Sequence, residues 1–247
     1  MAVENPTWGE ERIANELNLK LTIRISPRTV GKYLRRQSPV RTPDPKQRWL
    51  TFVRNHAKVM VACDFFVVIT AAFRTLYVFL VVEIGSRQIL HHHATAHPTA
   101  EWTLQQFREA LPGGHPYRFA IHDRGCIFSE SVDQGLANLG VRVLRTPVRA
   151  PKANSACERL GGSLRRECLD FLIPFNQRHL QMTIRDWAIH YNRRRPHSAL
   201  GPGLPEPISD QVPSHEHRHS LPIGYQVVKR SVLGGLHHEY GLKKEAA

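Results

Sequence analysis

Val61-Ala62-Cys63-Asp64-Phe65-Phe66-Val67 is the stretch that decides the fold, because it places one carboxylate inside an apolar, strand-like run. Burying a carboxylate is costly unless the group is paired, hydrogen-bonded or bound to a metal ion. The run therefore predicts a core strand whose acid, Asp64, either has a functional role or pairs with an arginine.

The segments around this run have the pattern of an α/β layer fold. Apolar and β-branched runs separated by short breaks predict three consecutive antiparallel strands, at 59–70, 75–84 and 87–94. Helices and strands then alternate, and we expect them at 98–111, 117–121, 129–139, 141–144, 156–170 and 179–191. This order predicts a mixed five-stranded sheet with flanking helices.

Residues 1–36 have the pattern of two short helices. Thr7 and Glu10 have the spacing of a capping box, and Ser26 followed by Pro27 is typical of the start of a second helix. The expected inner face of that helix consists of Val30, Tyr33 and Leu34. A basic second helix indicates a helix-turn-helix, whose second helix enters the major groove, although a plain helical hairpin is the alternative. We assign three of its residues to DNA contact: Arg28, Lys32 and Arg35.

The regions on either side of the predicted sheet are expected to be less ordered. Residues 37–55 contain the proline-rich, polar stretch at 37–48 and are interpreted as a linker to a domain at 56–200. Residues 201–247 form a tail rich in proline and histidine, where weak order is expected up to an apolar run at 227–233.

Charge is distributed unevenly over the 247 residues, whose net charge is +13. Residues 1–58 carry 12 Lys and Arg against 5 Asp and Glu, and residues 145–195 carry 11 against 4, whereas the segment between them has 6 against 7. Two basic blocks around a slightly acidic middle indicate a polyanionic partner, most simply nucleic acid.

Several protein classes are disfavoured by composition. No run approaches the ~20 apolar residues of a membrane-spanning helix, and the first residues lack a secretory signal, so we expect a soluble, cytoplasmic protein. The four cysteines form no Cys-x-x-Cys pair and are interpreted as reduced, mostly buried thiols. His91, His92, His93 and His97 do not predict a metal site, because alternation along a strand sends neighbouring side chains to opposite faces.

Two further carboxylates join Asp64 as candidate ligands. Asp123 follows the fourth expected strand, and Glu158 lies one turn into a helix that begins after a basic loop. Oxygen ligands on separate rigid elements suit Mg²⁺ or Mn²⁺, and two such ions can hold the attacking and leaving oxygens of a phosphoryl transfer. Taken singly, Asp123 could cap a turn and Glu158 could stabilise a helix N-terminus.

The order Asp64, Asp123 and Glu158, with 34 residues between the last two, resembles the Asp-Asp-Glu signature of RNase H-like transposases and retroviral-type integrases. Over roughly residues 5–202 the chain is similar to bacterial insertion-sequence transposases with an integrase catalytic core. The stretches that carry this resemblance are Asn-Pro-Thr-Trp-Gly at 5–9, Ile-Ser-Pro-Arg-Thr-Val at 25–30, Asp-Phe-Phe at 64–66, His-Pro-Thr-Ala-Glu-Trp at 97–102, Pro-Val-Arg-Ala-Pro-Lys-Ala-Asn at 147–154, Glu-Arg-Leu at 158–160, Ser-Leu-Arg-Arg-Glu-Cys-Leu-Asp at 163–170 and His-Tyr-Asn-Arg-Arg-Arg-Pro-His at 190–197.

The resemblance implies an RNase H-like core that cleaves the ends of a mobile element and transfers them into target DNA. It implies Mg²⁺ or Mn²⁺ as cofactor, with two ions held by the three acids, and double-stranded DNA and further copies of the chain as partners. Arg165 lies seven residues after Glu158 and so on the same helical face, where it could contact a phosphate. The remaining basic residues assigned to DNA are Arg149, Lys152, Arg193, Arg194 and Arg195.

Two departures from the relatives bear on activity. The chain starts almost directly at the helix-turn-helix, so recognition of terminal repeats is expected to be incomplete. Gly161 and Gly162 stand where relatives have a bulkier apolar residue, and helix-interior glycine is destabilising. A catalytically inactive, truncated DNA-binding product is therefore the alternative to an active transposase, and a nuclease without strand transfer is a third reading.

Overall fold

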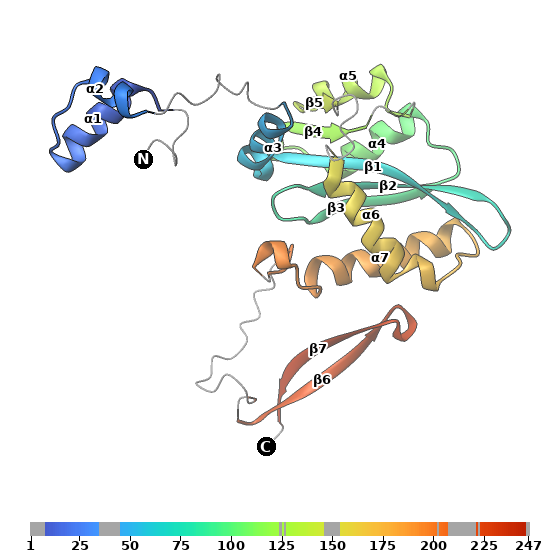
Figure 1. Cartoon of the computed structure of the whole chain (residues 1–247). Helices are drawn as coiled ribbons and strands as arrows, with labels where there is room; N and C mark the ends of the chain where they lie inside the picture. Colours follow the sequence, from blue (N-terminus) through green and yellow to red (C-terminus); the bar gives the residue numbers. More distant parts are fainter. Residues whose placement is uncertain are drawn as a thin grey trace. The chain divides into compact units, whose positions relative to one another are not determined.

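The computed structural model describes residues 8–34, 45–123, 125, 127–145, 154–201, 203–206, 221 and 223–245, with the backbone alone at 45–48. The chain divides into two compact units, Met1–Arg48 and Trp49–Ala247, and each is described by itself (Figure 1).

The larger unit is built on one five-stranded sheet. Its strands are β1 (Met60–Ile69), β2 (Thr75–Glu83), β3 (Ile89–Thr95), β4 (Phe119–His122) and β5 (Arg142–Arg145). They lie in the order β3-β2-β1-β4-β5, in which β1 to β3 are antiparallel neighbours and β4 and β5 run parallel to β1. This confirms the predicted mixed five-stranded sheet.

Helices cover both faces of the sheet because its central strands are apolar on both sides. α4 (Ala100–Ala110) and α5 (Glu130–Asn138) pack on the face that presents Val61 and Cys63. α6 (Ser155–Glu167) and α7 (Gln177–Arg193) pack on the opposite face, around the fully buried Trp187 (Figure 1). Short 3₁₀ helices lie at Ala57–Val59, Leu169–Phe171, Ser198–Leu200 and Leu233–Gly235.

The predicted linker extends too far along the chain. α3 (Pro45–His56) occupies its second half, and Trp49, Phe52 and Val53 pack against the core of the larger unit. The ring of Phe52 lies edge-on to Phe119, with 5.4 Å between their centroids. The helix was not predicted because its first residues, up to position 48, are proline and polar residues. The apolar residues of its buried face come only after position 48.

The predicted C-terminal tail contains a β-hairpin. Its strands are β6 (Tyr225–Val232) and β7 (His237–Lys244), and Gly234 and Gly235 take positive φ at the turn. β7 was not predicted, because its sequence, His-His-Glu-Tyr-Gly-Leu-Lys-Lys, has no β-branched residue. The hairpin is held to the core by polar contacts, including His190 Nδ1 with Glu239 Oε1 at 3.0 Å and His237 Nε2 with the Glu167 carbonyl at 2.6 Å.

The smaller unit is the expected pair of helices, α1 (Glu10–Leu21) and α2 (Pro27–Tyr33). Ser26 caps α2 as predicted, with its Oγ accepting from the Thr29 N–H at 3.1 Å. The N-cap position of α1 is Gly9, and the predicted capping box of Thr7 and Glu10 involves Thr7, which lies outside the described residues. Tyr33 is 84% exposed, contrary to prediction, because the small apolar cluster is centred on Ile13, Ala14 and Val30.

Among the described residues, no helix is long and apolar enough to cross a membrane.

Candidate active site

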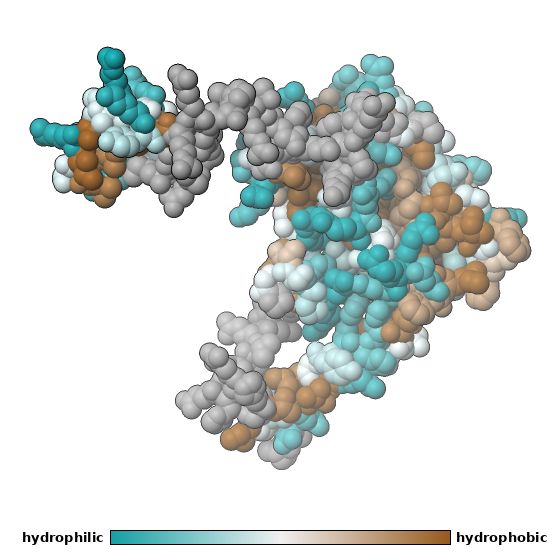
Figure 2. Space-filling view, viewed as in Figure 1, coloured by the Kyte–Doolittle hydropathy of each residue, from teal (hydrophilic) through white to brown (hydrophobic). Residues whose placement is uncertain are grey.

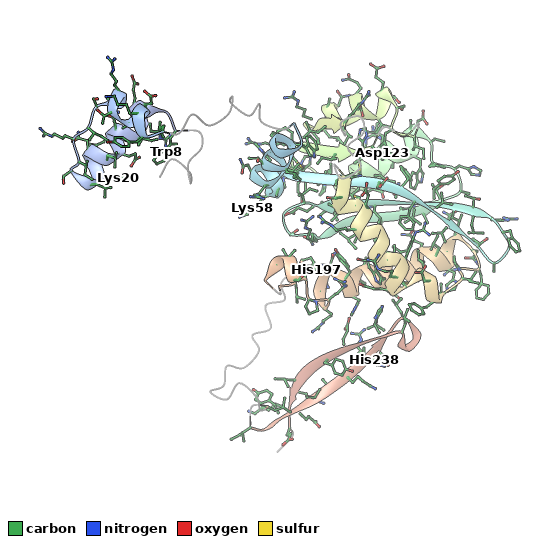
Figure 3. All side chains as sticks on the ribbon, viewed as in Figure 1. Trp8, Lys20, Lys58, Asp123, His197 and His238 are labelled. Carbon is green, nitrogen blue, oxygen red and sulfur yellow. The ribbon has the colours of Figure 1, made fainter. Side chains whose placement is uncertain are left out.

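The parallel pairing of β1 and β4 directs two of the candidate acids toward the same end of the sheet. Met60 lies opposite Phe119 and Ala62 opposite Ile121. β4 ends at His122, so Asp123 directly follows the strand that pairs with β1, at the end of the sheet toward which Asp64 also lies. Figure 3 labels Asp123, at the end of β4 beside β1.

The third acid, Glu158, lies on α6, and the start of α6 is fixed to β1. The Asn154 side-chain amide donates to the Cys63 carbonyl at 3.0 Å, one residue before Asp64 along β1. Cys157, Leu160 and Leu164 bury the inner face of α6 against the sheet. Glu158 therefore lies one turn into a helix whose N-cap residue, Asn154, is anchored beside Asp64.

Asn154, to which no role could be given from the sequence alone, occupies the N-cap position of α6. An asparagine there usually caps its own helix. This side chain makes no cap hydrogen bond and is 4% exposed, because it is turned toward β1. The N-cap pattern indicates the helix start, and only the tertiary structure gives the contact with Cys63.

The three acids influence one another electrostatically. Burial raises the pKa of Asp64 to about 6, opposed by a hydrogen bond from the Phe65 N–H at 2.8 Å and reinforced by the carboxylates of Asp123 and Glu158. Asp123 and Glu158 are themselves exposed. A carboxylate that is both partly buried and next to two others favours a cation in its vicinity.

The donor set fits a hard divalent cation by its chemistry, since all three side chains offer carboxylate oxygens. The carboxylates are nevertheless turned toward backbone donors: Asp64 Oδ1 toward Phe65 and Asp123 Oδ1 toward the Gly125 N–H at 2.9 Å. Within the described residues, no three His, Cys, Asp or Glu side chains meet closely enough to hold one ion. The assignment of Asp64, Asp123 and Glu158 as ligands accordingly stays a proposal.

His122 fixes the end of β4 from which Asp123 projects, a role that sequence reasoning missed. The ring is 1% exposed, its Nδ1 lies 2.6 Å from the Asp123 carbonyl, and its Nε2 lies 2.8 Å from Asp133 Oδ1 on α5. Asp133 also accepts from Arg145 Nε at 2.8 Å, which ties β5 into the same network. A histidine before an aspartate gives no signal of such a network in the sequence alone.

The arginines expected to bind DNA have protein partners in the structure. Arg165 donates to the Val67 carbonyl at 2.9 Å and lies over the Phe66 ring. Arg193 pairs with Glu206, Arg194 with Glu239 and Arg195 with Glu167, at N–O distances of 3.0, 3.8 and 2.9 Å. Exposed ion pairs are weak, so contact of these residues with DNA stays a prediction.

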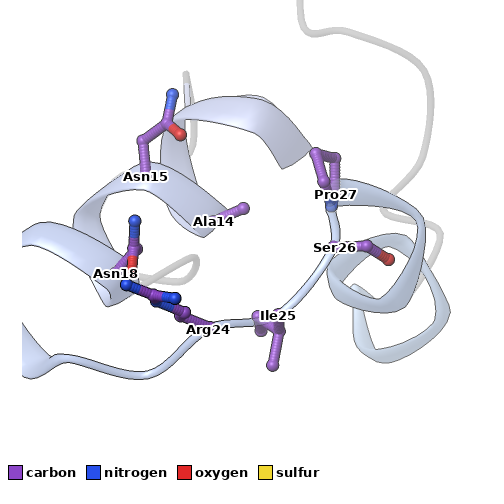
Figure 4. Close-up of a pocket in the computed structure, with 7 residues that line it drawn as sticks. All are labelled: Ala14, Asn15, Asn18, Arg24, Ile25, Ser26 and Pro27. Atoms are coloured by element: carbon purple, nitrogen blue, oxygen red, sulfur yellow. The ribbon is translucent and has the colours of Figure 1, made fainter.

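The remaining predicted DNA contacts divide between exposed and undescribed positions. Arg28 and Lys32 are exposed on α2. Arg35, Arg149 and Lys152 lie outside the described residues. The same small unit contains a pocket of about 410 Å³ between α1 and the segment before α2, lined by polar side chains that include Asn15, Asn18 and Arg24 (Figure 4).

The histidines of β3 bond to the helices on either side. His91 Nε2 lies 2.9 Å from Gln106 Oε1 of α4, whereas the ring and carbonyl of His92 contact Gln181 of α7. Neighbouring histidines thus face opposite sides of the sheet, as the alternation predicts.

Residues 139–205 match the family model described as "Integrase core domain". The match includes Glu158 and both helices of the α6–α7 face. It confirms the predicted integrase-type core for this part of the chain. No curated protein matches the chain in sequence.

Solved structures similar to the chain include the Mos1 transposase catalytic domain with raltegravir and magnesium, at 14% identity over 57% of this chain and 77% of that one, with a TM-score of 0.49. The catalytic core domain of BIV integrase matches at 13% identity. The match covers 60% of this chain and 91% of that one, with a TM-score of 0.45. A simian T-cell lymphotropic virus intasome in complex with a PP2A regulatory subunit matches at 13% identity. The match covers 75% of this chain and 66% of that one, with a TM-score of 0.49.

Proposed function

We propose that the chain is a transposase that cuts DNA ends and joins them to target DNA with divalent metal ions. The observation that carries the proposal is the parallel pairing of β1 with β4, which directs Asp64 and Asp123, the residue after β4, toward the same end of the sheet, together with the Asn154 contact that anchors the start of the Glu158 helix to β1. The integrase core match over residues 139–205 supports the same class of activity.

Asp64, Asp123 and Glu158 would hold Mg²⁺ or Mn²⁺, and we propose two ions. When bound, such ions activate an attacking hydroxyl and stabilise the leaving oxygen of a phosphodiester. The chain itself supplies three negative charges on rigid supports, which His122 and Asn154 hold in place. The two basic blocks supply the affinity for DNA, and Arg165 would reach a phosphate along the Glu158 helix.

We further propose that copies of the chain associate on DNA, because two ends must be joined together. An apolar patch supports this: Phe73, Phe171, Ile173 and Phe175 are each at least 68% exposed. The Ala71 N–H donates to the Pro174 carbonyl at 2.9 Å, which brings the two segments together. Figure 2 shows hydrophobic residues gathered near the β1–β2 turn. At about 150–250 Å² for each aromatic side chain, the exposed surface of the three supplies roughly half of the ~800 Å² per partner of a stable interface.

A DNA substrate would place such an enzyme in the bacterial cytoplasm.

The alternative of a catalytically inactive DNA-binding product is favoured by one observation, that the described carboxylates do not form a three-ligand group. Strand transfer on pre-cleaved DNA ends in Mg²⁺ distinguishes the readings. We expect activity from the parent chain and none from Asp64→Asn, Asp123→Asn or Glu158→Gln, with DNA affinity retained in all three. Amide variants that stay active would refute the triad, and an inactive parent that binds DNA would establish the alternative.

A further inference from the structure

The hairpin of β6 and β7 has one face toward α7 and the other face away from it. Along a strand, successive side chains point to opposite faces, and residues paired directly across two strands share a face. Glu239 is paired with Arg230, and its Oε1 lies 3.0 Å from His190 Nδ1 of α7. His237, two residues before Glu239, contacts the Glu167 carbonyl from the same face. We call this the inner face, and the residues that alternate with these form the outer face (Figure 1 shows both strands).

The outer face presents hydrogen-bond donors and carries no acidic side chain. Three of its four cross-strand pairs are Lys229 with Tyr240, Ser231 with His238, and Tyr225 with Lys244. All of these residues except Tyr225 are exposed, and Figure 3 labels His238. The only acid within β6 and β7 is Glu239, whose side chain is 12% exposed on the inner face. The positive charge of the outer face is therefore not neutralised within the hairpin strands.

The two lysines of this face have no partner among the residues that the structure describes, whereas the arginines at the end of α7 do. Arg193, Arg194 and Arg195 each pair with a glutamate. A single surface lysine is no evidence of a binding site, because water solvates it. Here the two lysines alternate with tyrosine, serine and histidine donors on one surface without an acid, which is the composition of a face that contacts phosphates.

The spacing of the two lysines suits duplex DNA. Tyr225 lies opposite Lys244, and Lys229 is four residues further along β6. At ~3.3 Å per residue, the two lysines lie about 13 Å apart along the ribbon. Each strand of duplex DNA carries one phosphate for every ~3.4 Å of helix axis, so the two lysines can reach different phosphates. A two-stranded ribbon is also narrow enough to enter the ~12 Å major groove.

We propose that the outer face of the β6–β7 hairpin binds the phosphate backbone of duplex DNA. Lys229 and Lys244 supply the ionic contacts, and the hydroxyls of Ser231 and Tyr240 donate hydrogen bonds to phosphate oxygens. Such contacts orient a protein on the duplex without reading its sequence. A second copy of the chain is the disfavoured occupant, because a protein of net charge +13 repels its own copy at a cationic face. The inference rests on the proposed function for DNA as the ligand, and it adds a face outside the basic blocks at 1–58 and 145–195.

The test measures the affinity of the full chain for a random-sequence DNA duplex as a function of salt, in EDTA. We expect Lys229→Gln and Lys244→Gln each to weaken binding and to lower the salt slope by about one, because each removes one phosphate contact. Lys243→Gln is the matched control. It removes the same charge from the neighbouring position, but Lys243 is paired with Gln226 on the inner face, so the slope should stay that of the parent.

Tyr240→Phe tests the hydrogen bond separately from the charge. It removes only the hydroxyl, so affinity should fall roughly two- to tenfold while the salt slope stays that of the parent. Because the substituted side chains are exposed, all variants should keep the melting temperature of the parent.

Three outcomes overturn the proposal. Unchanged slopes in Lys229→Gln and Lys244→Gln would show that the outer face does not contact DNA. An equal loss of slope in Lys243→Gln and Lys244→Gln would show that only the net charge matters. Parental DNA affinity together with a changed assembly state in sedimentation would make the face an interface between copies. Inactivity of the parent in strand transfer, with the salt slopes as expected, would count against the proposed function alone.

Discussion

The side-chain amide of Asn154 donates a hydrogen bond to the backbone carbonyl of Cys63 at 3.0 Å. It joins the first turn of the Glu158 helix to the strand of Asp64, at a point where both are buried. A helix of 13 residues is therefore fixed by a polar contact at the end that carries its acid, in addition to the apolar packing of Cys157, Leu160 and Leu164.

Replacing Asn154 by alanine should reduce strand transfer more than it reduces stability. The substitution removes a side-chain donor from the buried Cys63 carbonyl, and the loss of a buried hydrogen bond costs about 1–3 kcal/mol of unfolding free energy. We expect the rate to fall further than that cost explains, because the Glu158 helix is no longer anchored. Gln181→Ala is the matched control, since Gln181 bonds to Ala94 and His92 between α7 and β3. If both variants lose activity only in proportion to stability, Asn154 is a structural residue.

Gly161 weakens the same helix, and alanine should strengthen it. A Cβ at this position would meet no atom within 4 Å, so the substitution introduces no clash. Alanine is favoured over glycine inside a helix by up to about 1 kcal/mol, and we expect urea unfolding to record a gain of that order. Gly135→Ala in α5 is the control, because its Cβ would collide with Leu104. A loss of stability in Gly161→Ala would mean that α6 needs its glycine.

The parts of the fold that could be predicted are those set by local pattern. The apolar and β-branched runs around Asp64 predicted the strands, and the motifs around Asp123 and Glu158 predicted the order of the acids. The strand pairing that directs Asp64 and Asp123 toward the same end of the sheet is a tertiary property, as is the contact between Asn154 and Cys63.

The parts of the fold that were predicted wrongly also depend on tertiary contacts. Residues 37–48 suggested a continuous linker, although α3 begins at Pro45 and packs through apolar residues further along. β7 lacks the β-branched residues that mark strands, and it forms because β6 pairs with it. The ion pairs of Arg193, Arg194 and Arg195 join residues far apart in the sequence, so a basic run could not indicate them.

The exposed apolar patch predicts self-association that a single polar substitution should weaken. Phe73, at 90% exposure, contributes little to the core, so Phe73→Ser should preserve the melting temperature. We expect it to shift the chain from a larger assembly toward a monomer in sedimentation experiments. Val67→Ser, at 40% exposure on β1, tests whether any loss of apolar surface has this effect. A parent chain that is monomeric at all concentrations, with and without DNA, would contradict the proposed oligomer.

The basic face of α2 predicts a second salt-dependent contribution to DNA binding. Arg28→Ala and Lys32→Ala should each weaken binding and lower the salt slope by about one for every phosphate that the variant no longer binds. Lys20→Ala on α1 is the control, because Lys20 already pairs with Glu16 at 2.7 Å. A weaker affinity with an unchanged slope would show that the α2 residues support folding only.

The pKa of Asp64 makes the stability of the metal-free protein depend on pH. Its folded-state value of about 6 exceeds the ordinary 3.8, so the folded state binds this proton more tightly than the unfolded chain does. The resulting stabilisation is complete below pH ~4 and is lost as the pH rises through about 6. A difference of about two pKa units corresponds to roughly 3 kcal/mol. At neutral pH the ionised Asp64 side chain lowers the unfolding free energy by about this amount.

Asp64→Asn removes this pH-dependent cost, because an amide stays neutral. In EDTA, we expect its unfolding free energy to exceed that of the parent by up to about 3 kcal/mol near pH 7.5, and the difference to shrink toward pH 4. Asp133→Asn should have the opposite sign near neutral pH, because it breaks the pair with Arg145 and the bond to His122. Mg²⁺ should then stabilise the parent and leave Asp64→Asn nearly unchanged, since binding to the folded state alone raises stability. A difference between parent and Asp64→Asn that stays constant from pH 4 to 7.5 would show that this carboxylate does not titrate as a buried group beside two others.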